Sequence, residues 1–382
     1  MKIFIYSWAP ARNRQGRDLC SYLRDRGHEV QHAYPAHLGE CSSPSSPELP
    51  LRCPRWFGPP DQPGRRHITH AWLVLKALLH ARKMRPDVVV VINVDALVSA
   101  PLLLRHCRAS LVYYALEYTT RPEHVNVEKA RLRNCVDCLI DVEETRLAMR
   151  LARAGADMPA VTLWNAPRSG LPEPKGEALT QALIKTGVDP ARRRVLLYSG
   201  SYQRCASLEH LVSWAAANLD ASFLFVLLIT GEVPDTLLRA TSAAPRNVCL
   251  LRGVPPDRVL DYVKDATVAL LPYCDEEDPN VCYCSPQKLF DCLVCGVPFV
   301  GSQRPLVQRV AADSGAGVCT DIMDAQKLLA AVRAIADDQS TAEQMGRQGR
   351  AAYLHMYNFD FCAAKFADWL QEARAPRRLR HS

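Results

Sequence analysis

The chain alternates short apolar stretches with longer stretches in which apolar residues recur at helical spacing. Residues 2–6 (KIFIY) are apolar after Lys2, and Leu19, Tyr22 and Leu23 then share one face of a predicted helix that Gly27 ends. Further apolar stretches with the length of strands occupy residues 28–33, 86–93, 110–115, 137–142 and 160–165. Parallel strands are buried on both faces and are joined through helices, so this alternation predicts an α/β domain with a parallel sheet.

Helical patterns separate most of these predicted strands. They cover residues 70–83, 100–107, 124–134 and 143–155. Residues 34–66 interrupt the alternation, because prolines recur there among serine and glycine. This composition predicts a long loop, which could act as a lid over a binding site.

The same alternation begins again in the second half of the chain. Residues 166–177 (APRSGLPEPKGE) lack an apolar period and form the best candidate for a linker. After them, apolar stretches at 193–200, 222–231, 247–254 and 267–273 predict strands, and helical patterns cover 207–218 and 257–266. The sequence therefore predicts two Rossmann-like domains in tandem, over residues 1–167 and 178–354.

Composition narrows the class of protein without naming a function. A length of 382 residues suits two domains, and 48% hydrophobic with 23% charged residues is typical of a globular chain. A formal net charge of +7 favours acidic ligands, but an arginine-rich solvated surface accounts for it without nucleic acid. The odd number of cysteines, 15, does not suggest a disulfide framework. Without a visible signal peptide or membrane span, we expect a soluble protein of the reducing cytoplasm.

Residues 282–300 (CYCSPQKLFDCLVCGVPFV) contain the most informative pattern. Ser285 suits a helix N-cap, Pro286 the first helical position and Gly296 a left-handed C-terminus. Lys288 then falls in the first turn, where the helix dipole disfavours a cation unless an anion lies between them. A surface lysine that points away explains this position equally well. Asp291, one turn later, could bind sugar hydroxyls, and phosphate together with ribose indicates a nucleotide.

These residues carry a resemblance to a known family. Residues 285–300 (SPQKLFDCLVCGVPFV) resemble the donor-site segment of glycosyltransferases of the GT-B fold, particularly the large retaining family 4. Residues 136–155, 195–212 and 247–273 are similar to three further blocks of that family, in the same order. The resemblance is strongest over about 190–320. It implies a first domain that binds the acceptor, a second that binds a nucleotide sugar, and a C-terminal helix, within residues 355–382, that crosses back to the first domain.

The resemblance also implies roles for individual residues. Asp291 takes the place of the acidic residue that holds the donor ribose, and Lys288, with Arg204, would stabilise charge on the departing diphosphate. The other residues that it implies for the donor site are Gly200, Ser201, Arg252, Gly253, Val254, Ser285, Pro286 and Gln287. Three positions depart from the family pattern. Tyr283 stands where the first acidic residue is usual, and Ser201 and Ala206 stand where a basic pair is usual.

Candidates for the acceptor site come from the first domain. Glu117 follows the strand at 110–115, and its carboxylate could orient an acceptor hydroxyl or act as a base, although a solvated surface glutamate is the simpler interpretation. Trp8, Arg12 and Arg14 follow the first strand, at the edge where ligands of parallel sheets bind. His67 and His70 border the proline-rich loop and are weaker candidates.

Cysteine spacing offers a rival hypothesis. Cys282, Cys284, Cys292 and Cys295 form C-x-C and C-x-x-C pairs, but the second pair lies within a predicted helix, whereas zinc knuckles use loops. Buried small hydrophobic residues explain these thiols better, and we expect no bound metal.

Together, these observations predict a glycosyltransferase that moves a sugar from a nucleotide-diphosphate sugar of the UDP or GDP type, with no permanently bound cofactor. The acceptor would be a hydroxyl or amine of a small molecule or glycan, and the anomeric configuration would be retained. The alternatives are a nucleotide-sugar binder without activity or a partner subunit of a glycosyltransferase, a Rossmann oxidoreductase and a zinc module. The oxidoreductase is weak, because no G-x-G-x-x-G follows the first strand of this chain. We expect no nucleic-acid partner. The basic C-terminal tail allows a weak contact with a membrane surface, although such tails are usually solvated.

Overall fold

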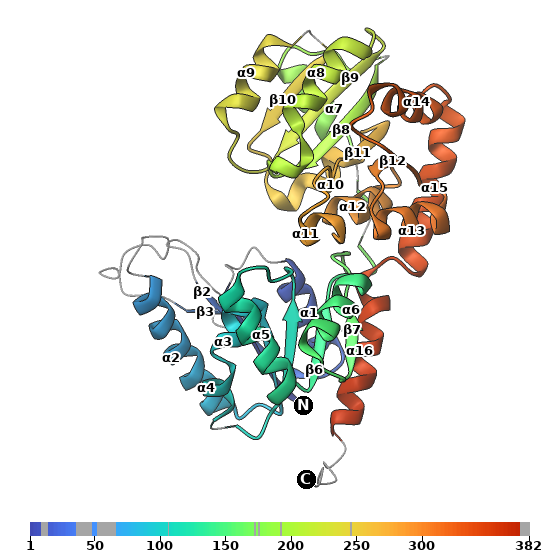
Figure 1. Cartoon of the computed structure of the whole chain (residues 1–382). Helices are drawn as coiled ribbons and strands as arrows, with labels where there is room; N and C mark the ends of the chain where they lie inside the picture. Colours follow the sequence, from blue (N-terminus) through green and yellow to red (C-terminus); the bar gives the residue numbers. More distant parts are fainter. Residues whose placement is uncertain are drawn as a thin grey trace. The chain divides into compact units, whose positions relative to one another are not determined.

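The computed structural model describes residues 1–8, 14–35, 48–51, 66–105, 107–171, 173–174, 176–191, 193–244 and 247–374. Arg12, most of the proline-rich segment and the basic tail from residue 375 lie outside these residues, as do the side chains of His67 and Arg204. The chain divides into two compact units, Met1–Trp164 with Cys362–Ser382 and Asn165–Phe361 (Figure 1). The C-terminal helix, from Cys362 onward, thus belongs to the first unit, as the resemblance implied.

The first unit contains a seven-stranded sheet in which every pair is parallel. Its strands are β1 (Lys2–Ser7), β2 (Glu29–Pro35), β3 (Glu48–Leu51), β4 (Val88–Ile92), β5 (Ser110–Ala115), β6 (Cys138–Asp141) and β7 (Ala160–Thr162). The order is β3-β2-β1-β4-β5-β6-β7. The chain runs outward from β1 to β3 and returns to β4 on the other side of β1. The carboxyl ends of β1 and β4 therefore form a topological switch point, where ligands of such sheets bind.

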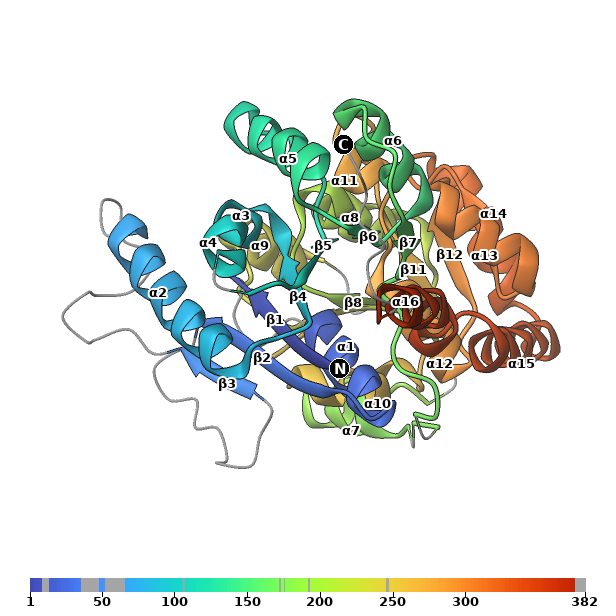
Figure 2. The same cartoon turned by 90° about the horizontal axis from the view of Figure 1, so that it is seen from below.

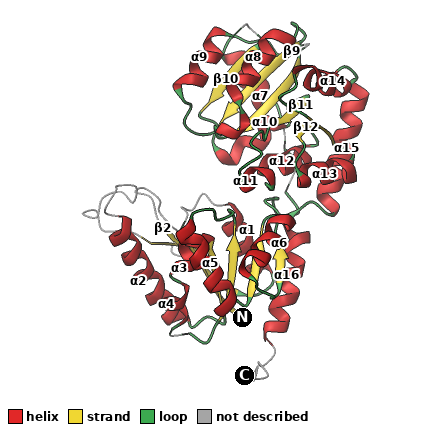
Figure 3. Cartoon of the chain, viewed as in Figure 1, coloured by secondary structure: helices red, strands yellow, loops and turns green. Residues whose placement is uncertain are grey.

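Helices flank this sheet (Figure 3). They are α1 (Arg14–Asp25), α2 (Arg66–Met84), α3 (Asn93–Val98), α4 (Ala100–Leu104), α5 (Pro122–Asn134), α6 (Glu144–Ala154) and α16 (Phe359–Arg374). Leu19, Tyr22 and Leu23 of α1 are fully buried, as their spacing predicted. The side chains of α2, α3 and α4 that face the sheet join one core with β1, β4 and β5.

The second unit contains a six-stranded, fully parallel sheet in the order β10-β9-β8-β11-β12-β13. Its strands are β8 (Arg194–Gly200), β9 (Phe223–Ile229), β10 (Val248–Arg252), β11 (Val268–Leu271), β12 (Phe299–Ser302) and β13 (Gly317–Thr320). Its α-helices are α7 (Ala178–Lys185), α8 (Leu208–Asn218), α9 (Asp235–Ala243), α10 (Val259–Val263), α11 (Pro279–Cys282), α12 (Gln287–Cys295), α13 (Pro305–Ser314), α14 (Ala325–Ala336) and α15 (Gln339–His355). Here the switch point lies between β8 and β11.

Several local predictions need correction. The predicted loop at 34–66 contains the short edge strand β3, in which Pro50 is tolerated because an edge strand leaves N–H positions unpaired. Helix α11 and the exposure of Phe361 were not predicted from the sequence: α11 is a single short turn, and Phe361 of the C-terminal helix is 53% exposed, whereas Phe359 and Phe366 are fully buried. Within the described residues, no helix has the length and apolar character needed to cross a membrane.

Candidate functional site

Helix α12 begins at the carboxyl edge of the second sheet, after β11. The helix starts at Gln287, and Pro286 is the N-cap, with ψ of 122° and no side-chain cap. Ser285 was wrongly predicted as the N-cap, because Pro286 remains extended and delays the helix by one residue. The Ser285 hydroxyl instead accepts a hydrogen bond from the Asn165 backbone N–H at 2.9 Å. Gly296 ends the helix in the left-handed conformation, as predicted.

Lys288 is buried in the first turn of α12 rather than pointing into solvent. Its Nζ donates to the Tyr198 hydroxyl at 3.2 Å and lies 4.4 Å from the centre of the Tyr198 ring and 5.1 Å from that of Tyr273. Among the described residues, no carboxylate lies within 4.0 Å of this nitrogen. Burying an ammonium group without an ionic partner costs free energy of folding, so we expect an anion to bind beside Lys288.

The tyrosines and thiols around Lys288 are neutral and do not supply that anion. Burial raises the pKa of the Tyr198 hydroxyl and of the Cys205 thiol, and it raises the pKa of the Cys284 thiol to about 12. Burial also lowers the pKa of Lys288 from 10.5 to about 8, because the charged form loses its hydration. At neutral pH the ammonium group is therefore still charged, and the Asp291 carboxylate, which raises the pKa of Lys288 less than burial lowers it, lies beyond ion-pair distance.

Gly200 leaves space beside this ammonium group. It is the last residue of β8 and has a φ of +136°, which a side chain disfavours. A Cβ atom at this position would lie 3.4 Å from Cε and 3.5 Å from Nζ of Lys288. The first N–H groups of α12 have no acceptor within the helix. The end of β8, the lysine and the start of α12 thus combine positive charge, hydrogen-bond donors and open backbone, which suits a phosphate group.

The other candidates of the second unit surround this position to different degrees. Asp291 lies one turn after Lys288 on α12 and is buried. Tyr283 is half-buried at the end of α11, and Ser201 is exposed just after β8. Arg252 and Gly253 are exposed at the end of β10, while Val254 is buried. Since β9 separates β10 from β8, the sheet does not bring Arg252 next to Lys288.

Sequence patterns did not reveal the two tyrosines that flank Lys288. Tyr198 lies in β8 and Tyr273 follows β11, so both resemble ordinary core residues of buried strands. Their position on the two strands of the switch point could have been inferred only with the strand order known.

At the carboxyl edge of the first sheet, the segment after β5 is held by three side chains. Asn93, at the end of β4 with a φ of +65°, accepts from the Leu116 N–H at 2.9 Å. Arg150 of α6 donates to the Glu117 carbonyl at 2.9 Å, and Arg153 donates to the Thr119 carbonyl at 2.6 Å. The Glu117 side chain itself is exposed. This fixed backbone keeps the Glu117 carboxylate at the sheet edge, available to a ligand.

A network of buried charged side chains holds the arginines that contact the segment after β5. Arg150 is fully buried and pairs with Asp141 of β6, with Nε 3.0 Å from Oδ2, and with Glu128 of α5. Glu128 also accepts from the Tyr113 hydroxyl at 2.8 Å and pairs with Arg153. Asp141 also pairs with Arg146 at 3.3 Å, so loss of Arg150 would leave each of the two buried carboxylates with one cation instead of two. The network links α5, α6 and β6.

The remaining acceptor-side candidates lie near the first strand. Trp8, just after β1, stacks on His70 of α2, with ring centres 4.2 Å apart and planes 21° from parallel. Arg14, at the start of α1, pairs with Asp18 at 3.4 Å. Trp8 and His70 are thus brought together, while Arg14 forms an ion pair along its own helix.

The thiols that suggested zinc lie mostly in the interior. Cys284, Cys292 and Cys295 are buried, and Cys282 is half-buried. Within the described ranges, no group of three or more His, Cys, Asp or Glu side chains has the arrangement needed to hold a metal ion.

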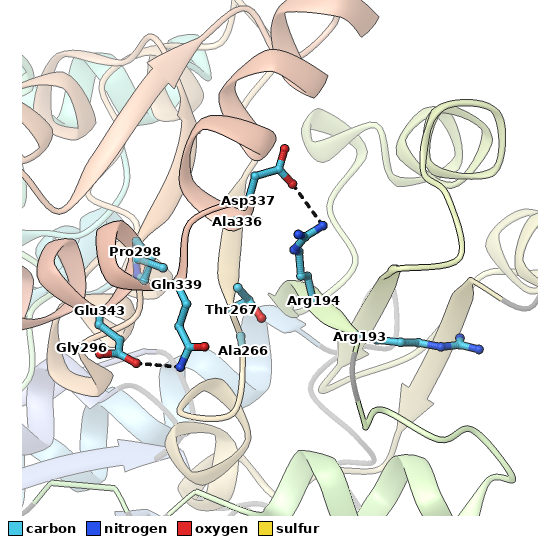
Figure 4. A pocket seen from close by; sticks show the side chains of 11 residues that line it. Arg193, Arg194, Ala266, Thr267, Gly296, Pro298, Ala336, Asp337, Gln339 and Glu343 are labelled. Atoms are coloured by element: carbon cyan, nitrogen blue, oxygen red, sulfur yellow. Dashed lines mark hydrogen bonds and ion pairs between the residues drawn. The ribbon is translucent and has the colours of Figure 1, made fainter.

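A cavity of about 550 Å³ lies elsewhere in the second unit, at the amino edge of its sheet (Figure 4). Arg194 pairs there with Asp337 at 3.1 Å, and Gln339 donates to Glu343 at 2.8 Å. These polar groups are already satisfied by one another, and the cavity lies at the opposite edge of the sheet from Gly200. It is therefore a weaker candidate for an anionic ligand than the Lys288 position.

The whole chain is similar to several solved structures. Sucrose-phosphate synthase from Thermosynechococcus elongatus matches with a TM-score of 0.74 and 17% identity, over 97% of this chain and 98% of that chain. Anabaena HepE in complex with UDP-glucose matches with a TM-score of 0.72 and 13% identity, over 97% of this chain and 100% of that chain. WaaG, a glycosyltransferase involved in lipopolysaccharide biosynthesis, matches with a TM-score of 0.66 and 16% identity, over 97% of this chain and 99% of that chain. No protein-family model matches the sequence, and no curated protein matches it significantly.

These similarities cover both compact units and establish the fold. The chain has two Rossmann-like domains of the GT-B fold, as its sequence predicted.

Proposed function

We propose that the protein is a glycosyltransferase that uses a nucleoside diphosphate sugar. It transfers the sugar to a hydroxyl or amine of a small-molecule or glycan acceptor, with retention of anomeric configuration and without a bound metal. The fold supports this proposal, because its solved relatives include a glycosyltransferase and HepE in complexes with UDP and UDP-glucose. The resemblance of residues 285–300 to family 4 supports it independently.

One observation carries the proposal. Lys288 holds a buried ammonium group without an ionic partner among the described residues, beside Gly200 and the start of α12. A diphosphate in this position would pair with the lysine and accept hydrogen bonds from the first N–H groups of the helix. Uridine diphosphate, the nucleotide in the HepE complexes, is the first candidate.

The proposed chemistry is stabilisation of a leaving group. As the bond between the anomeric carbon and the diphosphate oxygen breaks, negative charge grows on the diphosphate. Lys288 and the N-terminus of α12 stabilise that charge in a site that water does not reach freely. Asp291 binds ribose hydroxyls, and Arg204, whose side chain is outside the described part, contributes a second cation.

Glu117 is the proposed group on the acceptor side. Its exposed carboxylate is carried by a backbone segment that Asn93, Arg150 and Arg153 hold in place. It would accept a hydrogen bond from the acceptor hydroxyl and orient that oxygen toward the sugar.

A second candidate function is binding of a nucleotide sugar without transfer. Tyr283 stands where the family has its first acidic residue, and Ala206, fully buried, stands where a basic residue is usual. A chain with a competent diphosphate site but without these groups would bind the donor and leave it intact.

Calorimetry with UDP, GDP and ADP tests the proposal. We expect UDP or GDP to bind to the wild type, Lys288→Met to weaken binding at least about a hundredfold, and Lys288→Arg to retain part of it. Lys327→Met, at an exposed helix position, is the matched control and should bind as the wild type does. Transfer or hydrolysis of the bound donor then separates the enzyme from the binder. If the wild type bound none of these nucleotides, both candidate functions, transfer and binding without transfer, would be excluded.

A further inference from the structure

Helix α2 is apolar on two opposite sides. Leu75 and Leu79, one turn apart, are 46% and 54% exposed. A surface helix normally turns polar side chains outward, so its outer leucines need an explanation. The residues of α2 that pack into the core of the first unit are Leu73, Val74, Ala77, Ala81 and Met84.

The neighbouring α3–α4 segment extends this apolar surface. Val98 and Leu102 are 42% and 50% exposed, while Leu97 and Leu103 are buried in the same core that α2 covers. Helices α2 and α4 pack side by side (Figures 1 and 2). Because their core residues point to one cluster, the exposed residues of both helices point away from it. Four of the nine large hydrophobic side chains exposed in the described part of the chain thus lie on one side of the first unit.

The same segment is strongly basic. Residues 66–110 contain seven lysines and arginines against two aspartates, and α2 contains no acidic residue. Lys76, Arg82 and Lys83 lie on α2, and the Lys76 ammonium group is 5.1 Å from the centre of the Trp72 ring. Exposed aliphatic side chains, an aromatic ring and cations on one helix match the chemistry of a membrane interface.

We infer that this side of the first unit docks on an anionic lipid surface. The leucines and the valine enter the boundary between headgroups and acyl chains, and the cations contact lipid phosphates. We call this surface the α2–α4 face, and it consists of Leu75, Leu79, Val98 and Leu102 with Lys76, Arg82 and Lys83.

Charge argues against a second copy of the chain as the occupant. In a symmetric dimer the same patch meets itself, which would bring two basic patches together with no carboxylate on α2 to offset their repulsion. An anionic bilayer instead provides an apolar layer and negative charge at the same depth. The inference does not depend on the proposed function, since it involves neither Lys288 nor Glu117.

Co-sedimentation with vesicles tests the inference on the full chain. We expect binding to mixed phosphatidylglycerol and phosphatidylcholine vesicles and little binding to pure phosphatidylcholine. Leu75→Ser combined with Leu79→Ser should weaken binding about tenfold or more, because two insertions are lost. Arg82→Glu combined with Lys83→Glu should weaken it to a similar or larger degree and should remove the salt dependence.

A matched pair of substitutions controls for general loss of surface leucine. Ile184→Ser combined with Leu354→Ser changes two exposed side chains of the second unit and should leave binding within about twofold. A chain that ends at Arg374 removes the basic tail and should still bind. Thermal unfolding of every variant checks that it is folded. No binding by the wild type, equal binding to both vesicles, or loss of binding only on tail removal would overturn the inference. So would light scattering that shows a dimer dispersed by the α2 substitutions.

Discussion

Replacing Lys288 by methionine should make the protein without ligand more stable. The substitution keeps an unbranched side chain in the first turn of α12 and removes the charge that burial penalises. In most proteins, loss of a buried polar group destabilises the fold. Here the substitution should instead stabilise the fold. It removes the free-energy cost of burying the Lys288 charge, which no diphosphate offsets in the protein without ligand.

The magnitude follows from the pKa of Lys288. Burial lowers this pKa from 10.5 to about 8. A difference of about 2.5 units corresponds to roughly 3 kcal/mol of folding free energy at pH 7, where the lysine is charged in both the folded and the unfolded chain. Methionine leaves the Tyr198 hydroxyl without its donor and removes the contact with two aromatic rings, at a cost of about 1–2 kcal/mol. The net gain is about 1–2 kcal/mol.

The pH dependence separates this cause from a general packing effect. Between pH 8 and 10.5 the folded chain has lost the Lys288 proton while the unfolded chain retains it, so the stability of the wild type rises with pH. The advantage of Lys288→Met should therefore be complete below pH 8 and should shrink by about 2 kcal/mol at pH 9.5.

Urea unfolding of the wild type, Lys288→Met and Lys327→Met at pH 7 and pH 9.5 makes the comparison. Lys327→Met corrects for the general titration of surface lysines. A Lys288→Met variant that is less stable than the wild type at pH 7, or an advantage that does not change with pH, would refute the reasoning.

Other outcomes follow from the same geometry. Between about pH 7 and pH 8 nucleotide affinity should be nearly constant, since the terminal phosphate is ionised there. Above pH 8 it should fall about tenfold per pH unit, because binding requires the protonated form of Lys288. Calorimetry in buffers of different ionisation enthalpy would show the proton uptake. Gly200→Ala should weaken nucleotide binding about tenfold or more, since a Cβ would occupy space beside the ammonium group and alanine disfavours a φ of +136°, and titration with UDP measures this. Arg150→Met should destabilise the first unit by about 2–4 kcal/mol in urea unfolding, because Glu128 and Asp141 each lose one of their two cationic partners. Glu117→Gln should lower transfer at least about a hundredfold in a donor-turnover assay while UDP affinity stays unchanged.

Each of these outcomes has a result that would count against it. Affinity that already falls between about pH 7 and pH 8 would point to a group other than Lys288. Unchanged binding by Gly200→Ala would place the phosphates elsewhere. A wild-type-like Arg150→Met would show that the buried network carries no net stability, and equal loss of binding and transfer in Glu117→Gln would remove its acceptor role.

Most strands and the two-domain organisation could be predicted because burial on both faces leaves a strong pattern. A stretch such as residues 88–92, all valine and isoleucine, has no alternative to a central strand. Short elements lack such a pattern. The edge strand β3 has only four residues and includes Pro50, so its composition resembles the loop around it. Helix α9, with a single buried residue, and helix α11, with four residues in all, also gave no clear helical signal.

The candidate site was only partly visible in the sequence. The position of Lys288 at a helix start was local information, and so was the glycine that ends the helix. The burial of Lys288 was not, because it depends on Tyr198 and Tyr273, which lie 90 and 15 residues away along the chain and meet it only through the strand order. The Ser285 prediction failed because Pro286 remains extended, so that the helix starts one residue later. The Ser285 hydroxyl accepts from Asn165, 120 residues earlier, a partner that no local rule supplies.

A crystal structure of the protein with bound UDP tests the central claim most directly. The account predicts phosphate oxygens within hydrogen-bond distance of Lys288 Nζ and of the first N–H groups of α12, with the ribose near Asp291. Nucleotide bound at the amino-edge cavity beside Arg194, or density absent at saturating UDP with Lys288 still bonded to Tyr198, would contradict it.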